Sequence, residues 1–220
     1  MISDYQLRQD VIDELDFEPS INATHIAVGV HKGVVTLSGH VASYAEKMAA
    51  ESVVRRIRGV KAIAQDIEVH LPSDKKTGDD EIAQRALDIL RWRVGLPAER
   101  IKVKVEHGVV TLEGAVDWQF QRTQAESSIH ALTGVVGVVN LIRVASPVES
   151  SEIRGKIEKA LRRSAELDAS HVTVHTEGSR VILGGKVHAW YERELAERAA
   201  WAAPGVTEVQ DHIDVEPWLP

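Results

Sequence analysis

The chain has 220 residues but no cysteine, few aromatic residues (5%) and no surplus of basic residues. Without cysteine the chain can form neither a thiolate metal cluster nor a lipidated cysteine. The absence of cysteine is compatible with both an oxidising and a reducing compartment. The 33 acidic and 26 basic side chains give a net charge of −7. This disfavours a nucleic-acid partner, because phosphate binding needs clustered Lys and Arg. The longest uncharged run, residues 127–142, is too short to span a bilayer as a helix.

The remaining composition is sufficient for packed cores. Apolar residues make up 44% of the chain and charged residues 27%. This balance is typical of a soluble globular protein and argues against intrinsic disorder.

The sequence contains three copies of one repeat. The segment GVVTLSG from Gly33 to Gly39 returns 75 residues later as GVVTLEG from Gly108 to Gly114, and Gly114 corresponds to Gly185 after a further 71 residues. The same offsets hold over whole units, which predicts a repeated fold. We place the domains at residues 1–69, 80–144 and 151–220, the last with a short C-terminal tail. The segments 70–79 and 145–150 are linkers.

Each unit predicts the element order αββαβ. A first helix is indicated by apolar residues four positions apart, such as Leu7, Val11 and Leu15. An alternating hairpin, a second helix and a β-branched strand follow, and the last connection should be a parallel crossover. The residues ahead of the three first helices are N-cap types: Asp4, Asp79 and Ser150. The predicted fold class is α+β, with three tandem units, each a three-stranded mixed sheet covered on one face by two helices.

The repeated pattern is G-x-V-x-L-x-G-x-V, then A-x-x-x-A-x-x-V, then G-V-x-x-V-x-N-x-I-x-V. The second unit matches it most fully, from Gly108 to Val144. The first unit has Gln65 and the third has Asp211 where the second has Asn140. This pattern resembles the BON domain, a family named for bacterial osmotically inducible and nodulation proteins.

The resemblance implies a non-enzymatic role linked to the envelope or to osmotic stress. Members of the family resemble phospholipid-binding modules, periplasmic proteins that assist folding, and a cytoplasmic potassium-binding protein. The chain begins MISDYQ, without a basic or apolar leader. We therefore expect a cytoplasmic location, with a periplasmic one as the alternative if the natural N-terminus is missing.

The recurring residues indicate structure and not catalysis. Phosphate-binding glycine motifs, G-x-S-x-G and H-E-x-x-H are all absent from the sequence. His171 and His175 lie on one predicted strand, about 13 Å apart at ~3.3 Å per residue, too far for one ion. We predict no catalytic residue, no metal site and no cofactor.

The repeated glycines receive structural roles. We assign Gly33 and Gly108 to hairpin turns, and expect a different turn at Gly178. A second set, at 39, 114 and 185, is expected to allow close approach between helix and strand. The structural glycines are Gly33, Gly39, Gly59, Gly108, Gly114, Gly134, Gly178, Gly185 and Gly205.

Aromatic residues gather at the start of the second helices. Tyr44, Gln119 and Trp190 occupy one equivalent position. An aromatic ring there can pack between units, which we favour, or enter a membrane interface. The candidates for partner or interdomain contact are Trp92, Trp118, Phe120 and Trp201.

Basic residues gather in the first helix of the third unit, and anionic lipid headgroups would be attracted to such a patch. For this helix we favour a solvated face with ion pairs, because Glu152, Glu158 and Glu166 interrupt the cluster. The candidate lipid-binding residues are Lys156, Lys159, Arg162, Arg163, Trp190 and Tyr191.

Three hypotheses follow from the residues and the resemblance. The leading one is a stress-linked protein that binds anionic membrane surfaces or protein partners. The alternatives are a potassium or cation sensor and a chaperone-like scaffold. The sequence leaves open the ligand, the oligomeric state and the arrangement of the units.

Overall fold

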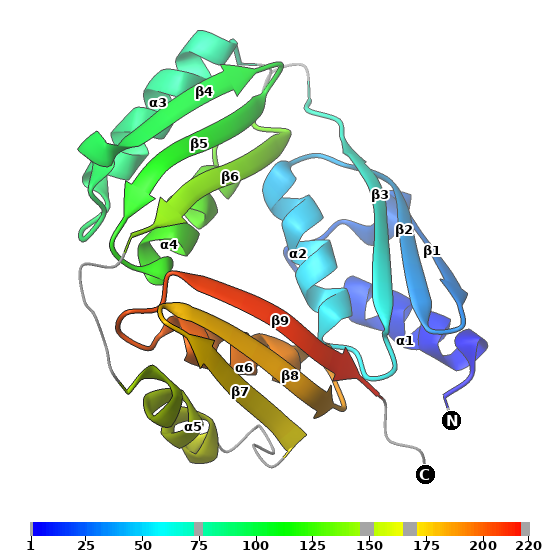
Figure 1. Ribbon diagram of the computed structural model, residues 1–220. Coiled ribbons are helices and arrows are strands. Elements are labelled where there is room, and N and C mark those ends of the chain that lie inside the picture. Colours follow the sequence, from blue (N-terminus) through cyan, green and yellow to red (C-terminus); the bar gives the residue numbers. More distant parts are fainter. Residues whose placement is uncertain (1, 73–76, 146–151, 165–170, 217–220) are drawn as a thin grey trace.

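The computed structural model describes residues 2–72, 77–145, 152–164 and 171–216, and the order αββαβ occurs in it three times (Figure 1). The first unit comprises α1 (Asp4–Phe17), β1 (Ile26–His31), β2 (Val34–Val41), α2 (Tyr44–Arg55) and β3 (Ala62–Val69). The second comprises α3 (Asp79–Trp92), β4 (Ile101–Glu106), β5 (Val109–Val116), α4 (Gln119–His130) and β6 (Gly137–Val144). The third comprises α5 (Ile153–Arg163), β7 (Val172–Glu177), β8 (Arg180–Val187), α6 (Trp190–Trp201) and β9 (Glu208–Val215).

Each sheet has its second strand in the centre. In the first unit β2 pairs antiparallel with β1 and parallel with β3, so that Leu37 lies between Val28 and Gln65. Leu112 and Leu183 hold the same central place in the other two sheets. The prediction of an α+β fold with three mixed three-stranded sheets is confirmed.

Three separate cores lie between the sheets and their helices. The positions four apart on each first helix are buried, as in α3, where Ile82, Ala86 and Leu90 face the sheet. Leu112 in the central strand and Ala125 in α4 complete the same layer, both fully buried. The repeated apolar pattern of the sequence therefore corresponds to one core design used three times.

The hairpin turns differ between units, as the shifted glycine predicts. In the first unit both turn residues, Lys32 and Gly33, have positive φ (51° and 81°), a combination typical of a type I′ turn. The third unit has its glycine first, at Gly178 (φ 61°), followed by Ser179. Glycine at the first position is typical of a type II′ turn, so the two-residue loop is kept while its backbone changes.

The glycines at 39, 114 and 185 serve a different close approach from the one expected. Their φ values are 120°, 140° and 110°, and a Cβ at Gly39 would overlap the carbonyl oxygen of His25. The α-helices that cover the sheet do not cause this crowding. At Gly39 and Gly114 the close neighbour is the last residue of a short 3₁₀ helix, Ala23–His25 or Ala98–Arg100, just before the first strand of the same hairpin. This contact leaves room only for glycine.

The N-cap assignment of Asp4 and Asp79 is also wrong. Ser3 caps α1 through its side chain, and Gly78 precedes α3 without a side-chain cap; Ser150 lies outside the described residues. The two carboxylates instead hold the hairpin turns. Asp79 accepts hydrogen bonds from the backbone N–H groups of His107 (2.8 Å) and Gly108 (2.9 Å), and Asp4 does the same in the first unit.

These hydrogen bonds lower the pKa of Asp79 below its ordinary value, because they favour the ionised carboxylate. The stabilisation should be fully present above pH 3.8, the ordinary value, and lost as pH falls through the lower pKa of the folded state. We expect Asp79→Asn to lower the urea midpoint at pH 7 more than the neighbouring Asp80→Asn. The difference in urea midpoint between Asp79→Asn and the parent protein should become smaller below pH 3.8. Equal losses, or a deficit independent of pH, would contradict this role.

The three units surround a common centre (Figure 1). Figure 1 places α2 and α4 toward the centre and the first helices α1, α3 and α5 toward the periphery. In this view α6 lies behind the sheet of the third unit, and it lines a groove together with α4. Contacts between α2 and α4 join the first two units directly. Among the described residues, none of the helices is long and apolar enough to cross a membrane.

Candidate functional site

The first junction is made by Tyr44, the first residue of α2. Its ring packs against the core of the second unit and meets the ring of His130 edge-on, with centroids 5.2 Å apart. Burial raises the pKa of the Tyr44 hydroxyl. An aromatic residue at a helix start thus joins two units, as the sequence favours.

The second junction is made by Trp190, the first residue of α6. Its ring packs against the core of the first unit, and its Nε1 is buried without a hydrogen-bond partner among the described residues. The Arg193 guanidinium lies 5.1 Å from the ring centroid, within the range of a cation–π contact. Trp190 is therefore a contact between units. Its assignment as a lipid-binding residue stays a prediction, which the packing of the partly buried ring against the first unit disfavours.

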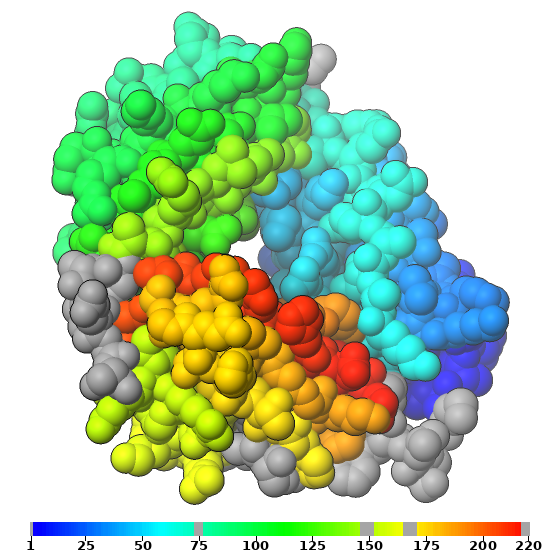
Figure 2. Space-filling model, in the orientation of Figure 1, coloured from blue at the N-terminus to red at the C-terminus, as the bar shows by residue number. Residues whose placement is uncertain are grey.

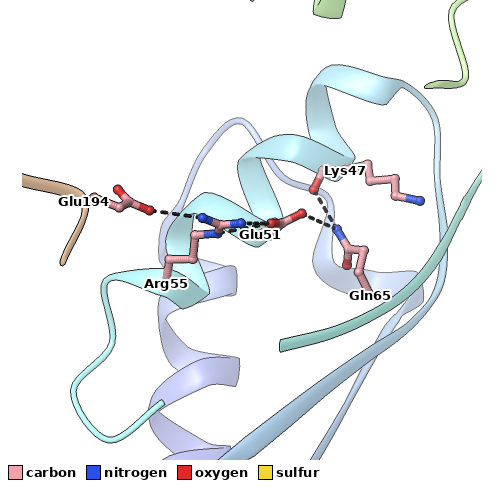
Figure 3. A network of polar contacts seen from close by, with 5 residues as sticks. All are labelled: Lys47, Glu51, Arg55, Gln65 and Glu194. Carbon is pink, nitrogen blue, oxygen red and sulfur yellow. Dashed lines mark hydrogen bonds and ion pairs between the residues drawn. The ribbon is translucent and has the colours of Figure 1, made fainter. Parts of the chain in front are cut away.

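A polar network crosses the same junction (Figure 3). Arg55, at the end of α2, forms ion pairs with Glu51 of its own helix (2.6 Å) and with Glu194 of α6 (3.2 Å). Figure 3 shows Glu51 lying between Arg55 and Gln65, whose Nε2 also donates to the carbonyl oxygen of Lys47. The network connects the third unit to the helix and sheet of the first.

The third junction is open. A groove of ≈ 900 Å³ lies between α4 and α6, with Arg55 of α2 at its border. Figure 2 shows the molecule hollowed between the green second unit, the red and orange third unit and the cyan and blue first unit. Three of the aromatic residues expected to make contacts line this groove together: Trp118, Phe120 and Trp201.

Gln119 takes the place of the ring at this junction. It is the first residue of α4, equivalent to Tyr44 and Trp190, and it lines the groove. Its Oε1 is buried and has no hydrogen-bond partner within the described residues. The sequence alignment of the units identified the position, but only the structure shows that it faces a groove.

The start of α4 is held firmly by Gln121. Its side-chain Oε1 accepts hydrogen bonds from the backbone N–H groups of Asp117 (3.0 Å) and Trp118 (3.1 Å), and its Nε2 donates to the carbonyl oxygen of Gly95 (2.7 Å). Glu46 and Glu192 accept equivalent backbone bonds in the other units. This repeated device fixes where the helix-start residues lie, and Gln121 itself is buried.

The polar lining of the groove is mostly paired within the protein. Glu194 binds Arg55, and Glu197 accepts a hydrogen bond from Trp201 Nε1 at 3.3 Å. Glu126 accepts one from Asn140 Nδ2 (3.0 Å) and lies 3.8 Å from His130 Nε2. His130 is the main cause that holds the pKa of Glu126 below its ordinary value. Sequence reasoning did not assign these acidic residues, since charged helix positions are ordinarily solvated.

The basic face of α5 is a separate surface. The apolar residues Ile153, Ile157 and Leu161 are buried, while all five basic side chains of the helix are exposed: Arg154, Lys156, Lys159, Arg162 and Arg163. Arg154 pairs with Glu158 at 2.7 Å, in line with the ion-paired face that the sequence favours. Among the described residues, no ion-pair partner is found for Lys159, Arg162 or Arg163. Figure 1 places α5 at the outer edge of the third unit.

The remaining candidates lie apart from the groove lining. Trp92, at the end of α3, is 86% exposed and touches none of the three cores. Tyr191 is 39% exposed at the start of α6 and hydrogen-bonds Glu192. Trp92 stays a prediction as a contact residue, and Tyr191 stays a prediction as a lipid-binding residue.

Histidines gather at one edge of the first unit. The rings of His25, His40 and His70 are stacked, with centroid distances of 4.5 and 4.8 Å. Stacked rings do not direct their nitrogens to one point, as a metal ion requires. The described part of the chain contains no group of three or more His, Cys, Asp or Glu side chains that could hold a metal ion.

If the ring of Trp190 joins the first and third units, removing it should destabilise the whole molecule. We expect Trp190→Ala to lower the free energy of unfolding by up to ~3 kcal/mol, less than for a fully buried Trp. The matched control is Trp92→Ala, which deletes the same side chain from an exposed site and should leave the urea midpoint nearly unchanged. Equal midpoints for the two variants would show that the junction contributes no stability.

These features define a class of protein: a tandem array of three αββαβ modules joined through their second helices. The family model described as "BON domain" matches residues 3–70, 78–146 and 149–217. The chain belongs to the BON domain family, with three copies of the domain in tandem.

A curated relative and two solved structures are similar to the chain. Osmotically-inducible protein Y of Escherichia coli (strain K12) is 34% identical over 125 residues, which span 55% of this chain and 62% of that protein. CdsD, a structural protein of the type III secretion system of Chlamydia trachomatis, matches with 16% identity and a TM-score of 0.27, over 96% of this chain and 92% of that one. The C-terminal domain of CdsD matches with 16% identity and a TM-score of 0.26, over 98% and 100%.

Proposed function

We propose that this chain is a non-enzymatic, stress-linked binding protein that attaches to anionic phospholipid surfaces through α5. Its similarity to an osmotically inducible protein supports the link to stress. The observation that carries the binding proposal is the exposed basic face of α5, at the periphery of the molecule. A protein with a net charge of −7 needs such a local patch to approach an anionic surface.

The geometry favours attraction by charge over insertion of rings. Trp190 packs against the core of the first unit, so the proposal does not rely on its ring as an anchor. Lys159, Arg162 and Arg163 stand exposed, and each basic residue near an anionic leaflet contributes about 1 kcal/mol. Binding of this kind is peripheral and reversible, and it weakens as salt screens the charges.

The test is co-sedimentation with vesicles of phosphatidylglycerol and phosphatidylcholine at low and high salt. The variant Lys159→Gln/Arg162→Gln/Arg163→Gln should lose most of the bound fraction seen at low salt. Its melting temperature should barely change, because exposed charges contribute little stability. Pure phosphatidylcholine vesicles should not bind the parent protein.

The matched control carries the same change in net charge elsewhere. Arg58→Gln/Arg91→Gln/Lys102→Gln removes three exposed basic residues that are spread over the first two units. This control should bind nearly as well as the parent. An equal loss in both variants would show that overall charge, and not α5, governs binding; a parent that stays in the supernatant at low salt would end the proposal.

A further inference from the structure

The third unit has a basic cavity beside its hairpin turn. The cavity, of ≈ 580 Å³, lies between the beginning of α5 and the end of the β7–β8 hairpin. Its described lining carries three basic side chains and one acidic one: Arg154, Lys156, Lys159 and Glu152. Basic groups therefore outnumber acidic ones around this space.

In the first two units a carboxylate of the chain itself lies between the first helix and the hairpin turn. Asp79 accepts hydrogen bonds from both N–H groups of the turn in the second unit, and Asp4 does the same in the first. The equivalent residue in the third unit is Ser150, which has no carboxylate and lies outside the described residues. The sequence of the third unit thus lacks the internal anion of the other two.

The hairpin turn of the third unit keeps one backbone donor for such an anion. Gly178 is equivalent to His107, whose N–H donates to Asp79. Gly178 is exposed and lines the cavity, and no acceptor is found for its N–H among the described residues. A type II′ turn reverses the middle peptide relative to a type I′ turn, so we assign only this N–H, and not that of Ser179, to the cavity.

The helix side of the cavity is more open and more basic than in the other units. In α1 and α3 a glutamine side chain donates to an aspartate one turn later, as Gln84 does to Asp88 at 3.1 Å. The third unit has Gly155 and Lys159 at these two positions, and a Cβ at Gly155 would meet no atom within 4 Å. A cation replaces the aspartate, and the place of the glutamine side chain is open.

The hairpin side of the cavity is more polar than in the other units. Val30 and Val105 pack against the cores of the first and second units. Their equivalent is Thr176, which brings a hydroxyl to the lining of the cavity. A hydroxyl, a backbone N–H and basic side chains are all donors to the oxygens of an anion.

The ion pairs near the cavity leave basic groups for a ligand. Arg154 pairs with Glu158 at 2.7 Å, but a guanidinium has several N–H groups in different directions. No ion-pair partner is found for Lys159 in the described part of the chain. Glu152 opposes an anion, and the three basic side chains of the lining outweigh it.

From these observations we infer that the cavity between α5 and the β7–β8 hairpin binds a phosphate group, in place of the carboxylate that the third unit lacks. The phosphate oxygens accept hydrogen bonds from the N–H of Gly178 and the hydroxyl of Thr176, and Lys159 balances their charge. A soluble phosphate and a lipid headgroup present the same group, so the inference does not rest on the proposed attachment to membranes.

The test follows the backbone amide of Gly178 in ¹H–¹⁵N NMR spectra of the full chain during titration with inorganic phosphate. Its proton resonance should move downfield and saturate, because the N–H gains a charged acceptor. The amide of Gly108, which already donates to Asp79, should stay in place. Absence of a saturable shift at Gly178, or the same shift with sodium chloride at equal ionic strength, would overturn the inference.

One pair of variants tests the hydroxyl. Thr176→Val introduces the residue of the other two units and should weaken phosphate binding about tenfold, because a hydrogen bond to a charged group is lost. Thr173→Val makes the same change on the same strand, at an exposed residue outside the described lining, and should bind phosphate as the parent does. Equal affinities of the two variants would contradict the assigned site.

A second pair separates the cavity from general attraction by α5. Lys159→Gln should weaken phosphate binding at constant ionic strength. Arg162→Gln/Arg163→Gln removes two exposed basic residues outside the described lining and should leave the affinity unchanged. An equal or greater loss in the double variant would show a diffuse effect of charge and overturn the inference.

Vesicles that contain phosphatidic acid identify the source of the phosphate. A smaller bound fraction for Thr176→Val than for Thr173→Val would show that lipid headgroups enter the cavity. Equal fractions, with a difference kept in the soluble titration, would assign the site to a soluble phosphate. Failure of the soluble titration beside intact, salt-dependent vesicle binding would overturn this inference and leave the proposed function standing.

Discussion

Packing of a partly buried aromatic ring from one unit against the core of the next is the interaction on which the arrangement of this molecule depends. Each unit has only about 65 residues, and a core of that size rarely supplies more than ~3–5 kcal/mol. Tyr44 and Trp190 extend two of these cores across unit boundaries. The Arg55–Glu194 ion pair links α2 to α6 at the second junction. A partly exposed pair of this kind contributes little stability by itself.

The packing between units determines which helices join the units and which are exposed. The second helices are turned toward the centre, where their first residues join the units. The first helices are peripheral, so the exposed basic side chains of α5 lie at the outer edge of the molecule, where the proposed contact with an anionic surface would form. Where the repeat departs from its own pattern, at Gln119, the centre keeps a groove that Trp118, Phe120 and Trp201 also line.

Periodicity predicted the fold well because each core position recurs in all three units. Leu37, Leu112 and Leu183 illustrate this, since all three are fully buried. Side-chain partners outside that pattern could not be predicted. Asp79 has the chemistry of an N-cap, and its true partners, two backbone N–H groups 28 and 29 residues away, depend on how the hairpin folds back. The role of Trp190 likewise depends on how the units are arranged, which no local pattern encodes.

The central claim, that the units are coupled through their second helices, is tested most directly by calorimetry of the full chain. Coupled units should unfold in a single transition whose calorimetric and van't Hoff enthalpies agree. Units that fold independently would give separate transitions, or one broad transition with a calorimetric enthalpy about three times the van't Hoff value. The first result is the one that the packing of Tyr44 and Trp190 predicts, and the second would contradict the account.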